Sequence, residues 1–243
     1  MTGRYTSEQL KKIAMGTMFV DHAAVAIVYG CGLNEVSPWI GNIGLAMRLI
    51  GRMAFPLYAF LLVQGFLWTR DWLRYAGRVA IFALVSEIPY DLVAFDLVWS
   101  AVRQSTMFTM LIGLVCMRGI QWALESDWCS GEGNVFPRNI MVTLIAALGA
   151  LAAELLRVDY GALGVLLILT LYVFRYRPIE QMIAGILLLY LTYRNEFAYA
   201  SWIAFFFISN YNGERGKKMG YVPYVFYPAH LLALWLAGAA MRL

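Results

Sequence analysis

The chain has 243 residues, of which 61% are hydrophobic and only 14% are Asp, Glu, Lys or Arg. A soluble domain of this length exposes too much surface to water to hide so many apolar residues. The composition therefore excludes a soluble enzyme, a disordered chain and a secreted disulfide scaffold. It predicts a single all-α domain over residues 1–243, a polytopic transmembrane helix bundle with any activity built inside the membrane.

Nine apolar runs follow one another along the chain, and each predicts a membrane helix. They cover residues 12–30, 44–68, 79–99, 107–125, 140–156, 161–175, 179–194, 197–210 and 222–240. Several lie near or below the ~17 residues that a spanning helix needs, so tilted, paired or re-entrant helices are expected. Lysine and arginine gather in alternate loops, which predicts a cytosolic N-terminus and an outer C-terminus. The net charge of +4 comes mostly from the Lys and Arg of the predicted cytosolic loops, and no nucleic-acid partner is expected.

Ionisable side chains interrupt these apolar runs, although each costs about 2.5–3.5 kcal/mol in a bilayer. They are Asp21, His22, Arg48, Arg52, Glu87, Asp91, Asp96 and His230. Counted at about 1.5 Å of rise per residue, both histidines and Glu87 are predicted to lie at one depth on three helices. Structural ion pairs are one interpretation of this set, and a catalytic centre is the other.

The two histidines are the only ones in the chain, and imidazole suits proton transfer near neutral pH. A carboxylate on the second ring nitrogen would hold the tautomer. Glu87 is the better predicted partner, because Asp21 and His22 point about 100° apart on a helix. Arg52 shares a helix face with Arg48 and is expected to pair with a carboxylate or to stabilise an oxyanion. Asp91 shares a face with Glu87, and no Cys or His spacing predicts a metal site.

Two basic segments are predicted on the cytosolic side, at residues 69–78 and 211–218. The first carries Arg70, Arg74 and Arg78 at a spacing of four, and the second carries Asn212, Arg215, Lys217 and Lys218 beside glycines. Contact with anionic membrane lipids is one interpretation. The other is a docking site for a polyphosphate, because basic side chains and turn amides suit phosphate oxygens.

Six segments in order carry a family resemblance over nearly the whole chain. They are Leu-Lys-Lys-Ile-Ala-Met-Gly-Thr-Met-Phe-Val-Asp-His (10–22), Gly-Arg-Met-Ala-Phe-Pro-Leu-Tyr-Ala-Phe-Leu-Leu-Val-Gln-Gly-Phe (51–66), Ser-Glu-Ile-Pro-Tyr-Asp-Leu (86–92), Asp-Tyr-Gly (159–161), Tyr-Asn-Gly-Glu-Arg-Gly (211–216) and Phe-Tyr-Pro-Ala-His-Leu (226–231). This set resembles the TraX family of bacterial inner-membrane proteins, whose name-giving members acetylate the N-terminus of conjugative pilin. That family is grouped with transmembrane acyltransferases that move an acyl group from cytosolic acyl-CoA to a sugar, lipid or peptide.

The resemblance implies a multi-pass inner-membrane protein with a membrane-embedded histidine as the base of acyl transfer. The family's residues fall on Asp21 and His22, Gly51 and Arg52, Glu87 and Asp91, and His230. Gln64 stands where the family more often has an acidic side chain, a departure that bears on the acceptor.

These observations together predict an acyl-CoA-dependent acetyltransferase. Acetyl-CoA, or another acyl-CoA, is expected to dock its phosphates on the two basic segments. His22 is preferred to His230 as the base, and Arg52, Tyr160 or Tyr227 is expected to face the oxyanion. The acceptor is predicted to be a pilin or peptide N-terminus, with O-acetylation of a lipid-linked sugar left open. The rival hypotheses are a proton-coupled transporter and a non-catalytic membrane partner of an assembly complex. The oligomeric state is not predicted.

Overall fold

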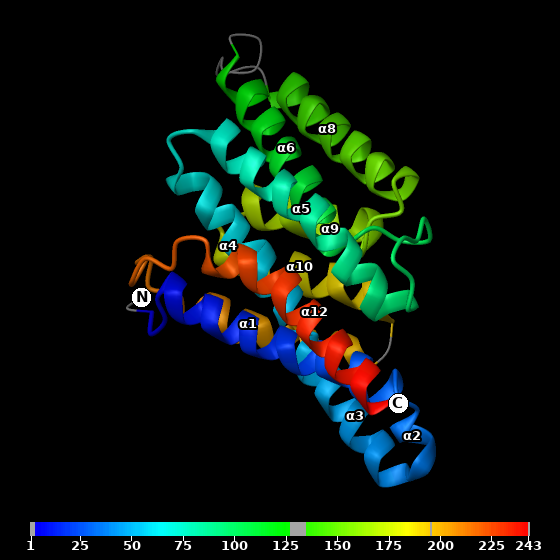
Figure 1. The fold of residues 1–243 in the computed structure, drawn as a ribbon. Helices are drawn as coiled ribbons and strands as arrows, with labels where there is room; N and C mark the ends of the chain where they lie inside the picture. Colours follow the sequence, from blue (N-terminus) through cyan, green and yellow to red (C-terminus); the bar gives the residue numbers. More distant parts are fainter. Residues whose placement is uncertain (1–2, 127–134, 195, 243) are drawn as a thin grey trace.

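The computed structural model describes residues 3–126, 135–194 and 196–242 and consists of helices joined by short connections (Figure 1). The helices are α1 (Ser7–Ala23), its π-helical continuation η1 (Ala24–Tyr29), α2 (Leu33–Val36), α3 (Pro38–Gly51), α4 (Ala54–Trp68), α5 (Trp72–Phe95), α6 (Thr106–Glu125), α8 (Val135–Leu155), α9 (Gly161–Val173), α10 (Pro178–Tyr193), α11 (Glu196–Ser209) and α12 (Val222–Met241). The described residues form isolated β-bridges but no strand. The predicted all-α fold is confirmed.

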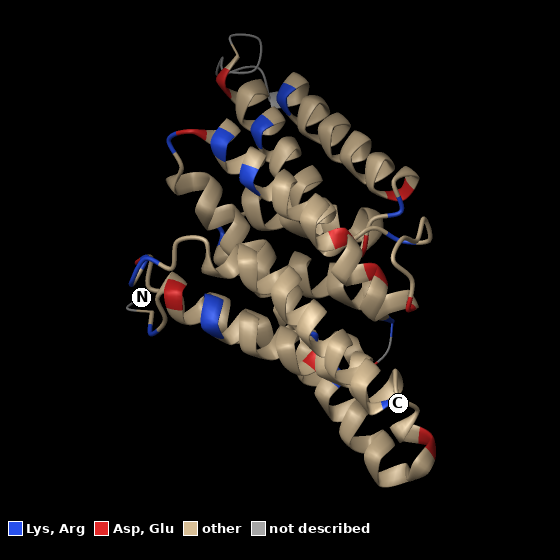
Figure 2. Ribbon diagram, viewed as in Figure 1, with Lys and Arg blue, Asp and Glu red and all other residues tan. Residues whose placement is uncertain are grey.

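Within the described ranges, five helical segments are long and apolar enough to cross a membrane. They are Ser7–Tyr29, Pro38–Trp68, Thr106–Glu125, Phe136–Leu155 and Val222–Met241. Three further apolar helices are shorter, Gly161–Val173, Pro178–Tyr193 and Glu196–Ser209. The chain is therefore a membrane protein with several helices of spanning length, as the composition predicts. Charged residues lie mostly near helix ends and in connections, with few in the middle of the bundle (Figure 2).

The apolar run 44–68 was predicted as one helix, but it is broken between α3 and α4. Pro56 has no N–H to donate to the carbonyl of Arg52, so the regular helical pattern is interrupted there. The N–H groups of Arg52 and Met53 instead donate to the carbonyls of Leu49 and Ile50. The break therefore places Arg52 at a corner inside the bundle.

The helix predicted over 79–99 begins earlier, at Trp72, so the segment 69–78 is not a loop. Asp71 caps the helix, because its carboxylate accepts the backbone N–H of Arg74 at 3.0 Å. Glu87 is consequently the sixteenth of the 24 residues of α5, further from the helix start than expected. The depth counted for Glu87 assumed a helix that starts at residue 79, so its lying level with the histidines stays a prediction.

Helix α4 is the centre of the bundle, with ten of its 15 residues buried. It packs on α1, α9 and α11, while α12 packs on α5 and α1. Figure 1 shows α12 crossing close to α1 and α5, although these helices are far apart in sequence. This crossing brings the two histidine-bearing helices into contact.

The connections gather at two opposite ends of the bundle. At the N-terminal end, the N–H groups of Arg4 and Tyr5 donate to the carbonyl of Asn210, and the N–H of Lys217 donates to Glu8. At the C-terminal end, Arg242 pairs with Asp96, and residues 104 and 157–159 are joined by backbone hydrogen bonds. These contacts tie the loops of each end to one another.

Close packing of α10 on α11 depends on Gly185. A Cβ at this position would lie 2.2 Å from the ring of Phe205, so Gly185→Ala forces the ring or the helix to move. We expect a destabilisation of about 1–3 kcal/mol, measured as a lower melting temperature in detergent. Gly16→Ala is the matched control, because a Cβ there meets nothing within 4 Å. Equal melting temperatures for the two variants would contradict the packing argument.

Candidate active site

Asp21 is held between Arg48 of α3 and Arg52, the residue that ends this helix. Its carboxylate accepts from Arg48 at 2.7 Å and from Arg52 at 2.6 Å, and its side chain is only 9% exposed. Gly51 makes this approach possible, because a Cβ there would lie 2.1 Å from the Cβ of Asp21. The expectation that Arg48 and Arg52 share a face is therefore met, and both side chains are used to bind Asp21. The carboxylate of Asp21 consequently supports α3 rather than the adjacent histidine.

The two histidines contact each other directly across α1 and α12. Nδ1 of His22 lies 2.7 Å from Nε2 of His230, and Nδ1 of His230 lies 2.7 Å from the carbonyl oxygen of Phe226. A carbonyl only accepts, so this network assigns the proton of His230 to Nδ1. Its Nε2 then accepts from the Nδ1–H of His22. The Nε2 lone pair of His22 is left available to take a proton from a reacting group.

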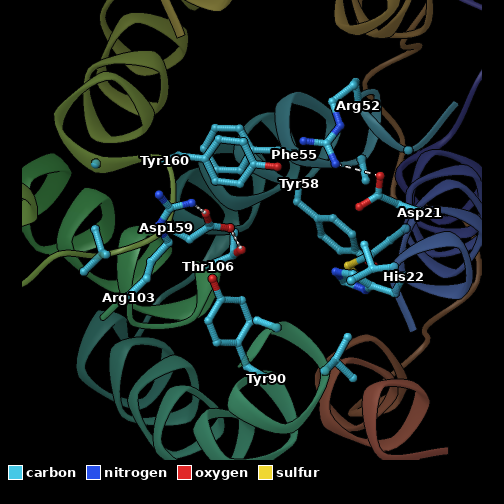
Figure 3. Close-up of a pocket in the computed structure, with 18 of the residues that line it drawn as sticks. Asp21, His22, Arg52, Phe55, Tyr58, Tyr90, Arg103, Thr106, Asp159 and Tyr160 are labelled. Atoms are coloured by element: carbon cyan, nitrogen blue, oxygen red, sulfur yellow. Dashed lines mark hydrogen bonds and ion pairs between the residues drawn. The ribbon is translucent and has the colours of Figure 1, made fainter. Parts of the chain in front are cut away.

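A cavity of about 910 Å³ opens beside this histidine pair. His22, Asp21, Arg48 and Arg52 lie on one side of it. Figure 3 shows Arg103, Thr106, Asp159 and Tyr90 on the opposite side, with Tyr58 and the Phe55–Tyr160 pair between. The rings of Phe55 and Tyr160 stack with centroids 3.7 Å apart. The cavity extends to the connections of the C-terminal end, where Val102, Arg157 and Val158 line it.

A second cavity, of about 510 Å³, leads from the N-terminal end. Its mouth is basic, lined by Lys11, Arg78, Arg215, Lys217 and Lys218. Hydrogen bonds fix part of this mouth: Arg215 donates to the carbonyl of Trp68 at 3.1 Å and covers its ring, and Lys217 donates its N–H to Glu8 at 2.8 Å. The interior is more apolar, with Leu61, Leu62 and Val79 among its lining residues.

The two cavities meet at a shared set of side chains, Met18, Tyr58, Thr106, Met110 and Tyr227. The hydroxyl of Tyr58 is buried and has no hydrogen-bond partner among the described residues, and that of Tyr227 lies beside Thr106 without a well-formed hydrogen bond. His22 and Tyr227 lie close together, with ring centroids 6.3 Å apart. Unpartnered donors next to an available base are typical of a site that completes its hydrogen bonds with a substrate.

The structure brings together some predicted site residues and separates others. Tyr160 and Tyr227 line the larger cavity, while Arg78, Arg215, Lys217 and Lys218 line the smaller one. Arg70 and Arg74 are exposed outside both cavities, and Arg74 pairs with Asp71 at 2.9 Å. Asn212 bonds with Glu214 and shapes the turn rather than lining a cavity. The regular spacing of these arginines did not distinguish Arg78, which lines a cavity, from Arg70 and Arg74, which do not. Helix α5 starts within this segment, directly after its cap Asp71.

Glu87 does not contact either histidine, contrary to the prediction. It accepts the backbone N–H of Ser105 at 3.1 Å, and Asp91 accepts that of Ser100 at 2.7 Å. Both carboxylates thus hold the loop between α5 and α6. This loop carries Arg103 to the cavity, so Glu87 and Asp91 position the far wall instead of acting on a histidine.

Sequence reasoning did not identify Tyr58, Arg103, Thr106 and Asp159 as site residues. Asp159 and Tyr58 lie inside two of the segments that carry the family resemblance, which was a usable signal. Thr106 precedes an apolar run, and Arg103 is a single basic residue between two apolar runs, which is no signal for a site. Among the described residues, no three His, Cys, Asp or Glu side chains gather as a metal site.

The fold and these cavities define a polytopic helical membrane protein with a buried polar centre. The TraX protein family matches residues 6–237, and the chain belongs to this family. It is 27% identical over 254 aligned positions to the probable fimbrial assembly protein FimC, serogroup H1, of Dichelobacter nodosus, and the alignment covers 95% of this chain and 94% of that protein. No solved structure matches the chain.

The structural role of Glu87 is testable by two substitutions. Glu87→Gln keeps an acceptor for the N–H of Ser105, so we expect a melting temperature close to that of the native protein. Glu87→Ala leaves this buried N–H unsatisfied and is expected to cost about 1–3 kcal/mol, measured as a lower melting temperature in detergent. A large loss of stability in Glu87→Gln as well would show that the charge, and not the hydrogen bond, is required.

Proposed function

We propose that the protein is a membrane-embedded acyltransferase that moves an acetyl group from acetyl-CoA to an amine. The observation that carries the proposal is the available Nε2 of His22 at the place where a basic cavity and a polar cavity adjoin. Donor and acceptor would enter from opposite ends and meet at this histidine. Residues 3–6 and 210–221 would then face the cytosol of a bacterial inner membrane, in agreement with the orientation predicted from loop charges.

Acetyl-CoA is proposed to enter through the smaller cavity. Its phosphates would bind at the mouth, where Lys217, Lys218 and Arg215 supply positive charge. The pantetheine arm would follow the apolar interior toward Tyr58 and Tyr227. Arg70 and Arg74 have no part in this path, because they lie outside the cavity.

Acyl transfer at His22 would follow general-base catalysis. The neutral amine attacks the thioester carbon while Nε2 of His22 takes one proton from its nitrogen. The tetrahedral intermediate then collapses to the amide, the C–S bond breaks, and the imidazolium returns the proton to the departing thiolate of CoA. His230 would hold the ring of His22 through Nδ1 and receive part of the developing positive charge.

The oxyanion of the intermediate is proposed to be stabilised by the hydroxyl groups of Tyr58 and Tyr227. Both are buried without a well-formed hydrogen bond among the described residues, and both tyrosines line the two cavities. Donors already oriented in a low-dielectric site lower the energy of a developing negative charge. Arg52 is less suited to this task, since Asp21 already holds its guanidinium.

We infer that the acceptor is the N-terminus of a fimbrial or pilin subunit. The support is membership of the TraX family and the similarity to a protein named for fimbrial assembly. The larger cavity, open toward the C-terminal end, would admit the terminal residues of an extended peptide.

Acetyl transfer is tested with purified protein in proteoliposomes, labelled acetyl-CoA and a synthetic peptide with a free N-terminus. We expect labelled peptide and free CoA in equal amounts. Failure of acetyl-CoA to bind or react would contradict the proposal, and solute-driven proton movement in the same vesicles would support a transporter instead.

Substituting each histidine in turn distinguishes the general base from the histidine that only orients it. We expect His22→Ala to lower kcat/KM by about 10²–10⁴, the range for loss of a general base. His230→Ala should lower kcat/KM less, because a water molecule in place of the imidazole can accept the Nδ1–H of His22. The opposite order would assign the base to His230. Melting temperatures measured for both variants control for loss of fold.

Neutralising the basic mouth tests donor docking. The double substitution Lys217→Ala and Lys218→Ala is expected to raise the KM for acetyl-CoA roughly 2- to 30-fold with kcat largely kept, because exposed charge pairs contribute about 0.2–1 kcal/mol each. Arg74→Ala is the matched control, since this arginine is exposed and outside the cavity. A KM that is unchanged in the double variant would exclude this mouth as the docking site.

A further inference from the structure

The wall of the larger cavity opposite the histidines centres on Asp159. The hydroxyl of Thr106 donates to Oδ2 of Asp159 at 2.8 Å, and the hydroxyl of Thr109 donates to its backbone carbonyl. Figure 3 shows Tyr90 with its hydroxyl directed toward Thr106 and Asp159. The side chain of Asp159 thus lies on the cavity with its backbone fixed.

Asp159 and Asp21 differ in how completely their oxygens are used. Both oxygens of Asp21 are bound by arginines at 2.7 and 2.6 Å. For Asp159, the nearest cation to Oδ1 is Arg103, at 3.6 Å, which is too long for a hydrogen bond. The side chain of Arg103 is 59% exposed, against 22% for Asp159. The backbone N–H of Tyr160 also acts on this carboxylate, but its four lone-pair sites leave accepting capacity on the side of the cavity.

A cation with N–H donors fits this place. Burial raises the pKa of Asp159, although the hydrogen bond from Thr106 and the charge of Arg103 oppose the shift. A bound ammonium would stabilise the ionised carboxylate through charge-assisted hydrogen bonds. The hydroxyl of Tyr90 is directed toward the same place (Figure 3), and a phenolic oxygen accepts an N–H. Glu154 is less available, because its Oε1 accepts the N–H of Ala162 at 2.8 Å.

We infer that Asp159, with Thr106 and Tyr90, binds the protonated amino group of the acceptor before transfer. This inference rests on the proposed function and assigns the place where its amine acceptor is held before transfer. The bound ammonium loses one proton to water from the C-terminal end. The neutral amine then crosses the cavity to His22, where its second proton is taken as the amide bond forms.

The test is equilibrium binding of two matched probes to the purified full chain, without acetyl-CoA. At pH 6, well below the usual pKa of an α-amino group, phenylalaninamide carries a protonated amine, and 3-phenyllactamide carries a hydroxyl in its place. We expect the native protein to bind the amine at least 10-fold more tightly, because a site built for charge rejects a neutral analogue. Asp159→Asn should bring the ratio of the two affinities near one while keeping the hydrogen bond from Thr106.

Three further variants complete the experiment. Asp96→Asn is the matched control, because Asp96 pairs with Arg242 and Trp235 outside the cavity, and the ratio should not change. Asp159→Glu should retain a preference for the amine, which guards against a folding defect in Asp159→Asn. Arg103→Gln removes the competing cation and should tighten amine binding.

Equal binding of the two probes to the native protein would overturn the inference. An unchanged ratio in Asp159→Asn, or weaker amine binding in Arg103→Gln, would overturn it too. These measurements need no acetyl transfer. An amine-selective site in a protein that never transfers acetyl would contradict the proposed function alone, whereas transfer without amine selectivity would contradict only this inference.

Discussion

The ion triad of Asp21 with Arg48 and Arg52 is the interaction on which the centre of the molecule depends. A charge buried in an apolar bundle is costly unless paired and hydrogen-bonded, and both oxygens of Asp21 are satisfied by guanidinium groups. The triad fastens α1 to α3 at the corner created by Pro56. Because adjacent residues of a helix point in different directions, fixing Asp21 toward α3 leaves His22 free to meet α12.

The histidine pair follows from the same constraint. A carboxylate beside His22 would have brought a further charge into the apolar interior. The chain uses His230 instead, whose ring is oriented by the carbonyl of Phe226. Pro228 lies in the same turn of α12, so the helix there already departs from regular hydrogen bonding. A base is thus oriented by neutral groups alone, which limits the electrostatic cost in a low-dielectric surrounding.

The two walls of the larger cavity are supported in different ways. The histidine wall is tied by side-chain ion pairs between helices. The opposite wall depends on a loop whose backbone N–H groups are accepted by Glu87 and Asp91, two carboxylates near the end of α5. Such carboxylates satisfy backbone groups that would otherwise be buried without partners. Two acidic residues of one apolar helix therefore hold the loop that forms one wall of the cavity.

The sequence by itself determined the all-α membrane class, the helical runs to within a few residues in most cases, the shared face of Arg48 and Arg52, and the family. It also singled out the two histidines, since both lie within long apolar runs, but their direct contact was not predicted. Only the tertiary structure decided that Asp21 binds arginines, that Glu87 holds a loop, and that Asp159 faces His22 across a cavity. Hydropathy and helical period are properties of one helix at a time. The rotation and offset of one helix against another come from packing, as at Gly51, where contact with Asp21 requires the absence of a side chain.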